Sequence, residues 1–160
     1  MSLASLRLAP GEEDPEHRPP LISLVLAFLP MLPLLAGAAL AWVDDRDSAL
    51  GIRLCAVWAG ALICFLAGVR RGLRFRQDGG PTLAQLATTL WLFVLGVASL
   101  LSPSVTPALL LQLLAFLSLA VLDPIAAKRG EAPRYFARLR PAQTLLPVGS
   151  LLLLLLKVVA

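Results

Sequence analysis

The sequence predicts an all-α protein, a polytopic transmembrane bundle of five helices preceded by a disordered N-terminal tail. Five apolar stretches of about twenty residues, separated by short polar loops, fill the chain after the tail, and a helix of that length crosses a bilayer. The composition agrees, because 58% of the residues are hydrophobic and the mean hydropathy is +0.82. Soluble domains contain roughly 45–50% apolar residues.

Residues 1–19 form the predicted tail. The segment between Pro10 and Pro20 is acidic and too polar to bury apolar surface, so we expect it to be disordered. It lacks the basic start and the small-residue cleavage site of a secretory signal. Residues 20–160 form the predicted transmembrane domain, with spans expected at about 21–43, 49–69, 82–101, 105–122 and 142–159.

The first span contains Pro30 and Pro33, which remove two backbone donors and predict a kink or local unwinding. Carbonyl groups freed by a proline need partners inside a membrane, so we expect this region to face protein. The loop that follows is a tight polar turn. Arg53, about one turn into the second span, is expected to reach the nearby surface or to pair with Asp44, Asp45 or Asp47.

A stripe of small residues runs along the second span at intervals of four residues and predicts a face for close helix packing, within the bundle or between subunits. Its members are Ala56, Gly60, Cys64, Gly68 and Gly72. In the third and fourth spans, Gln85, Thr88 and Gln112 suit either a polar path or, more simply, interhelical hydrogen bonds.

Asp123 and Pro124 are expected to end the fourth span, and two interpretations are open. A carboxylate at a helix C-terminus is electrostatically unfavourable, which indicates a salt bridge to an arginine. Alternatively, Asp123 caps a short helix that starts at Pro124 and ends at Gly130. The loops after the second and fourth spans share one membrane side, so a structural polar cluster is expected from Arg70, Arg71, Asp123, Arg138 and Arg140.

Basic residues are distributed unequally between the two membrane sides. The tail and the loops after the second and fourth spans contain Arg7, Arg18, Arg70, Arg71, Arg74, Arg76, Lys128, Arg129, Arg134, Arg138 and Arg140. The opposite side has Arg46 and Lys157. The positive-inside rule then predicts a multi-pass protein of the cell inner membrane, with a cytoplasmic N-terminus and a periplasmic C-terminus.

The residue types favour an interaction or assembly protein, with a small-molecule or ion transporter or channel as the alternative. An enzyme is not expected, because the single histidine, His17, lies in the tail and no span holds a pair of carboxylates. No catalytic, cofactor-binding or metal-binding residues are predicted. The expected partners are the lipid bilayer, anionic lipid headgroups at the cytoplasmic face and other membrane proteins, and not nucleic acid.

Several segments occur in the same order as in a known family: residues 29–30 (LP), 65–72 (FLAGVRRG), Asp123, 133–140 (PRYFARLR) and Thr144. In this order the chain resembles the bacterial domain-of-unknown-function family related to animal transmembrane protein 69, which shows SFLGG-x-x-WG and P-x-WY-x-x-LR-x-x-LT stretches. The chain departs from that pattern at Ala67, Arg71 and the Arg134–Tyr135–Phe136 triplet. The resemblance implies a polytopic inner-membrane protein in bacteria. It indicates no particular activity, because the family is itself uncharacterised.

The orientation can be tested with reporter fusions. A reporter that is active only in the periplasm should be active when fused after Ala160 and silent when fused after Gly80, because the arginine-rich side stays in the cytoplasm. The measurement is reporter activity in whole cells at matched expression. The reverse pattern of activity would contradict the predicted topology.

Overall fold

A computed structural model describes residues 21–43, 46–74, 82–129 and 136–159, and its architecture confirms the all-α class. Five of its helical segments are long and apolar enough to cross a membrane. The helical elements are α1 (Leu21–Phe28), the 3₁₀ turn η2 (Leu29–Met31), α2 (Leu32–Val43), α3 (Ser48–Arg74), α4 (Leu83–Leu100), α5 (Val105–Lys128) and α6 (Phe136–Val159). The tail expected at residues 1–19 lies outside the described residues.

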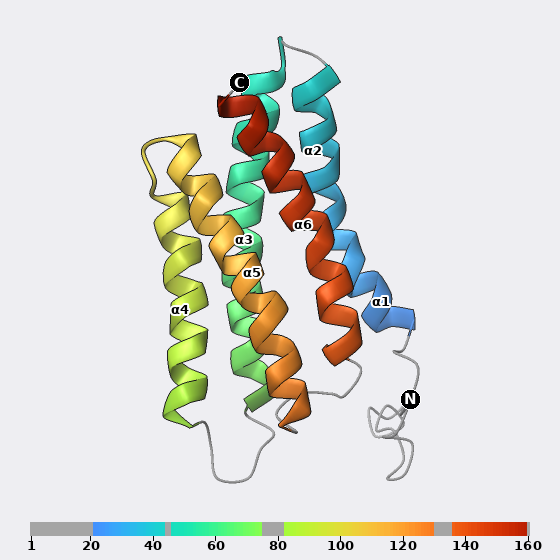
Figure 1. Ribbon diagram of the computed structural model, residues 1–160, viewed down its shortest axis with the longest axis vertical. Helices are drawn as coiled ribbons and strands as arrows, with labels where there is room; N and C mark the ends of the chain where they lie inside the picture. Colours follow the sequence, from blue (N-terminus) through green and yellow to red (C-terminus); the bar gives the residue numbers. More distant parts are fainter. Residues whose placement is uncertain (1–20, 44–45, 75–81, 130–135, 160) are drawn as a thin grey trace, which may run out of the picture.

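The spans alternate in direction through the bundle (Figure 1). Consecutive elements pack together from α2 through α6, and α6 also packs against α2, which closes the arrangement into a ring. In addition, α3 contacts α5 across the ring. As a result, the end of α3, the start of α4, the end of α5 and the starts of α1 and α6 all lie at one end of the bundle.

The expected break in the first span is confirmed. The chain forms a 3₁₀ turn at Leu29–Met31, between α1 and α2, with Pro30 at its beginning. The backbone carbonyl of Pro30 accepts a hydrogen bond of 2.8 Å from Trp58 Nε1 on α3. The bilayer core offers no water to hydrogen-bond a carbonyl that an interrupted helix leaves free. The Trp58 side chain supplies the donor from within the protein.

Three helices extend beyond the apolar stretches from which they were predicted. α3 continues past residue 69 to Arg74, α5 continues past residue 122 to Lys128, and α6 begins at Phe136 rather than at residue 142. The placement of Asp123 at a helix terminus is therefore wrong, because α5 passes through Asp123 and Pro124 without ending. The salt bridge to an arginine is confirmed, and the cap of a short helix is not. Transmembrane helices tolerate proline where neighbouring groups satisfy the freed carbonyls.

The interior of the ring is filled by apolar side chains from every span. Leu34, Ile63, Leu92, Phe116 and Leu151 are fully buried. Large apolar side chains also cover the outside, such as Val43 and Leu145, which are more than two-thirds exposed. An apolar exterior is expected for helices whose outer face is solvated by lipid.

The helix α3 carries two faces of small residues, of which the sequence interpretation recognised one. Gly51 and Cys55 lie against α2, where a β-carbon on Gly51 would be 3.2 Å from the Gly37 carbonyl oxygen. On the predicted stripe, a β-carbon on Gly60 would be 2.7 Å from Leu100 Cγ of α4. Close backbone contact of this kind allows helices to associate without a hydrophobic driving force.

The predicted stripe is only partly a packing face inside the bundle. Ala56, Gly60 and Cys64 lie toward α4 and α5, since the Ala56 carbonyl receives a hydrogen bond from α5 and Cys64 Sγ lies against Gly96. Gly68 and Gly72 are exposed, and a β-carbon on either would meet no other part of the described structure within 4 Å. Their assignment to an internal packing face is wrong, because α4 does not cover α3 there.

Substitution of the two glycines by leucine should therefore have different effects. Gly60→Leu should lower the free energy of unfolding by about 1–3 kcal/mol, because the side chain would overlap Leu100 and Ser99. Gly68→Leu, the matched control, should leave it within about 0.5 kcal/mol. Reversible unfolding in detergent, followed by tryptophan fluorescence, measures both. Equal destabilisation by the two substitutions would contradict the packing of Gly60 against α4 and the exposure of Gly68.

Candidate functional site

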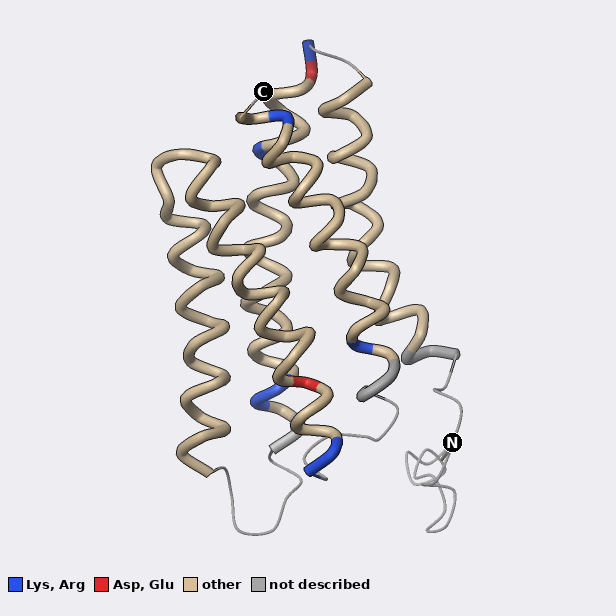
Figure 2. The backbone as a smooth tube through the Cα atoms, in the orientation of Figure 1, with Lys and Arg blue, Asp and Glu red and all other residues tan. Residues whose placement is uncertain are grey.

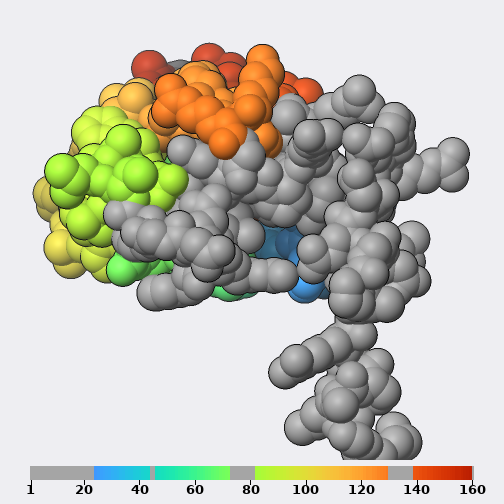
Figure 3. All heavy atoms as spheres, turned by 90° about the horizontal axis from the view of Figure 1, so that it is seen from below, coloured from blue at the N-terminus to red at the C-terminus, as the bar shows by residue number. Residues whose placement is uncertain are grey.

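Charged residues of the described chain gather at the two ends of the bundle and leave its middle uncharged (Figure 2). The end at which α3 and α5 finish and α6 begins contains three charged side chains that are buried rather than exposed. Arg70 of α3, Asp123 of α5 and Arg140 of α6 are 7%, 4% and 7% exposed, respectively. Figure 3 views this end from outside, with the last turns of α5 in orange beside α4 in yellow-green.

Asp123 lies between the two arginines and contacts both. Arg70 Nη1 donates a hydrogen bond to Asp123 Oδ1 in a close ion pair. The other carboxylate oxygen, Oδ2, lies 3.2 Å from Nε of Arg140. One carboxylate therefore bridges guanidinium groups from two other helices, and it does so inside the protein, where removing one partner leaves an uncompensated charge.

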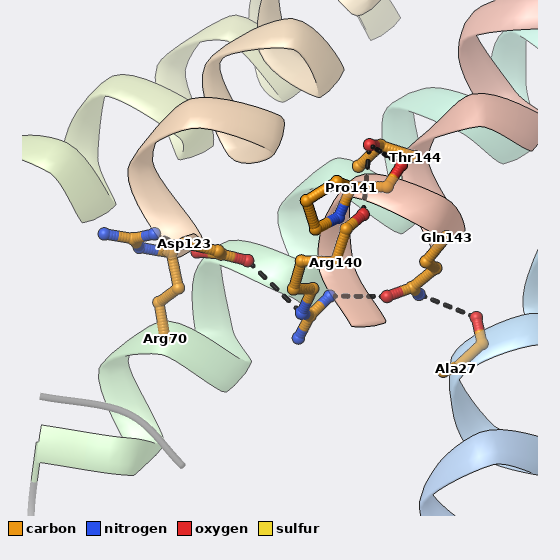
Figure 4. A network of polar contacts seen from close by, with 7 residues as sticks. All are labelled: Ala27, Arg70, Asp123, Arg140, Pro141, Gln143 and Thr144. Carbon is orange, nitrogen blue, oxygen red and sulfur yellow. Dashed lines mark hydrogen bonds and ion pairs between the residues drawn. The ribbon is translucent and has the colours of Figure 1, made fainter. Parts of the chain in front are cut away.

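Hydrogen bonds extend this ion pair to the remaining spans, and Figure 4 shows the contacts on the side of Arg140. Arg70 Nη2 donates to the Thr88 hydroxyl of α4 at 3.3 Å. On the other side, Arg140 Nη1 donates to Gln143 Oε1 at 3.1 Å, and Gln143 Nε2 donates to the Ala27 carbonyl of α1 at 2.6 Å. The network thus connects all five spans in the order α4, α3, α5, α6 and α1.

Local sequence features position the members of this network. Ala27 lies three residues before Pro30, which has no N–H to donate to the carbonyls of the preceding turn. The Ala27 carbonyl accepts a hydrogen bond from the Gln143 side chain instead. The hydroxyl of Thr144 lies 3.0 Å from the Arg140 carbonyl and 2.9 Å from the Pro141 carbonyl, which supports the first turn of the spanning part of α6. The Thr88 hydroxyl is held in turn by the carbonyl of Gln85 at 3.0 Å.

The structure brings together three of the five residues proposed for the polar cluster, namely Arg70, Asp123 and Arg140. Arg71 follows Arg70 on α3 and is half-buried. Because adjacent residues of a helix face different directions, Arg71 does not share the orientation of Arg70. The side chain of Arg138 lies outside the described residues. Sequence reasoning missed Gln143 and Ala27 entirely. A polar amide one turn after Arg140 in an otherwise leucine-rich span was the available signal.

A second set of polar contacts lies deeper in the bundle. Gln112 Nε2 of α5 donates to the Ala56 carbonyl of α3 at 2.6 Å and to the Ser99 hydroxyl of α4 at 3.2 Å. The expected interhelical hydrogen bonds are therefore confirmed for Gln112 and for Thr88. Gln85 differs, because it forms a capping box with Thr82 at the start of its own helix.

The network offers charge pairing and hydrogen bonding, although Arg140 Nε and Asp123 Oδ2 meet as an ion pair without forming a hydrogen bond. Within the ranges that the structure describes, no group of three or more His, Cys, Asp or Glu residues could hold a metal ion. The arrangement is that of a multi-pass membrane protein whose polar residues connect its helices.

Comparison with protein families identifies the chain further. It belongs to the family described as a protein of unknown function (DUF3429), whose model matches residues 19–156. That match covers all the spanning helices except the last residues of α6. The comparison with curated proteins and the comparison with solved structures each gave no match.

Replacement of the central carboxylate tests the network. Asp123→Asn should destabilise the protein by about 3–5 kcal/mol, because two buried guanidinium groups lose their counter-charge. The free energy of unfolding in detergent is the measurement. Asp47→Asn removes the same charge from an exposed position and should change stability by less than about 0.5 kcal/mol. If both variants unfold alike, the Asp123 contacts are not a stabilising feature.

Proposed function

We propose that the protein is a non-enzymatic component of the bacterial inner membrane that binds a transmembrane helix of another membrane protein. Its tail would lie in the cytoplasm and its C-terminus in the periplasm, as the excess of arginines on the tail side supports. Kinship with animal transmembrane protein 69 is part of this proposal and is supported by the two sequence motifs around residues 65–72 and 133–140.

The observation that carries the proposal is an uncovered apolar face on α3. Pro30 of η2 and Trp58, Ala61 and Phe65 of α3 line an open groove of about 310 Å³. Gly68 continues the same face of α3 one turn further, and a β-carbon there would meet nothing within 4 Å. An apolar groove followed by a glycine suits the close approach of another transmembrane helix.

Transport is the alternative, and the buried charged residues within the spanning helices favour it. Secondary transporters bind their substrates near the membrane midplane, at interrupted helices that move relative to one another. In this chain the three buried charges lie at one end and pair among themselves, and the same network joins all five spans. These features support an interaction role over transport.

Gly68→Leu tests the interaction role. The protein, expressed at its natural level, is extracted in mild detergent and its complexes are weighed by native mass spectrometry. The parent chain should leave the membrane with a stoichiometric protein partner, and the Gly68→Leu variant should lose that partner because leucine fills the approach surface.

Gly149→Leu is the matched control, because Gly149 is also an exposed helical glycine with nothing within 4 Å of a β-carbon, but it lies on α6. It should retain the partner. A parent chain that is extracted alone with a bound small molecule would contradict the interaction role and favour transport. Equal complexes for all three chains would show that the α3 face is not the binding surface.

A further inference from the structure

A second polar site lies at the opposite end of the bundle, where α3 begins and α4 turns into α5. An open cavity of about 310 Å³ lies between Arg53 of α3, the turn at Ser102–Ser104 and the first residues of α5. Arg53 is the one charged side chain among the described residues that line it. The walls otherwise combine serine hydroxyl groups with apolar side chains such as Val57 and Leu100.

Within the part of the chain that the structure describes, the Arg53 guanidinium takes no part in holding the fold together. Among the described residues, none forms an ion pair or hydrogen bond with Arg53, and this includes the neighbouring Asp47. The expected alternative partners, Asp44 and Asp45, lie outside the described residues. Arg53 is about one turn into α3, where a long basic side chain reaches the headgroup level of a bilayer. Its planar donors match the oxygens of a phosphate.

The start of α5 adds hydrogen-bond donors to the same cavity. Ser104 precedes the first turn of α5, and its side chain makes no capping hydrogen bond. The Ser104 hydroxyl group therefore does not cap the first amides of α5. Uncapped amides at a helix N-terminus attract anions. The hydroxyl of Ser102 donates to the Ser104 carbonyl at 3.0 Å, which supports the turn that presents these donors.

We propose that this cavity binds a phosphate group, held by Arg53, the Ser104 hydroxyl and the start of α5. The ligand is a phospholipid headgroup or inorganic phosphate. Val57, Leu100 and Val105 supply apolar walls beside the polar donors, and this favours a headgroup whose acyl chains extend along the bundle. The cavity lies at the opposite end of the bundle from the Asp123 network, so the two sites are separate.

Binding can be measured on the delipidated, full-length protein in detergent. One arm titrates phosphatidylglycerol and counts bound lipid by native mass spectrometry, and the other titrates inorganic phosphate by isothermal titration calorimetry. The parent chain should bind at least one of these probes. Arg53→Gln should weaken that binding by about tenfold or more, because a charge-assisted hydrogen bond is lost. Ser104→Ala should weaken it several-fold and covers the case in which the arginine variant fails to fold.

Arg46→Gln is the matched control, because it removes a positive charge from the same end of the bundle outside the cavity. It should bind like the parent chain. Loss of lipid binding alone in Arg53→Gln identifies a headgroup site, and loss of inorganic phosphate binding identifies a site for the free anion. The proposal is overturned if the parent chain binds neither probe, or if Arg53→Gln binds as tightly as Arg46→Gln.

Discussion

The contact of Asp123 with two arginines is the constraint on which the rest of the bundle depends. A carboxylate and two guanidinium groups buried at one end of a membrane bundle are costly unless they meet, because the surroundings cannot solvate them. Their meeting fixes α3, α5 and α6 in depth and rotation relative to one another. Gln143 and Thr88 then extend the same constraint to α1 and α4.

The remaining contacts are of the kinds that stabilise helices in lipid, where apolar surface gains little from burial between helices. Small residues bring backbones together, as at Gly37 and Gly51 between α2 and α3. Side-chain donors reach carbonyls of neighbouring helices, as Trp58 does at the 3₁₀ turn and Trp42 Nε1 does at the Leu153 carbonyl, 3.1 Å away. The polar network and the close helix packing therefore support the same arrangement.

Hydropathy alone was sufficient to predict the fold class and the number of spans, because a helix that crosses a bilayer must be both long and apolar. It misplaced several helix ends, since α3 continues to Arg74 and α5 continues through Asp123 to Lys128, into regions where hydropathy falls but the chain remains helical. The pairing of Asp123 with an arginine followed from its charge and topology, whereas the contact between Gln143 and Ala27 joins distant spans and leaves no local pattern. The four-residue spacing predicts a small-residue face that includes Gly68, but it does not reveal that no described helix packs against Gly68.

A double-mutant cycle on Arg70 and Asp123 tests the central claim most directly. The free energy of unfolding in detergent is measured for the parent chain, for Arg70→Gln, for Asp123→Asn and for the double variant. Because the two side chains are paired and buried, we expect a coupling energy of about 0.5–3 kcal/mol. A coupling energy indistinguishable from zero would contradict it, since the two residues would then stabilise the bundle independently.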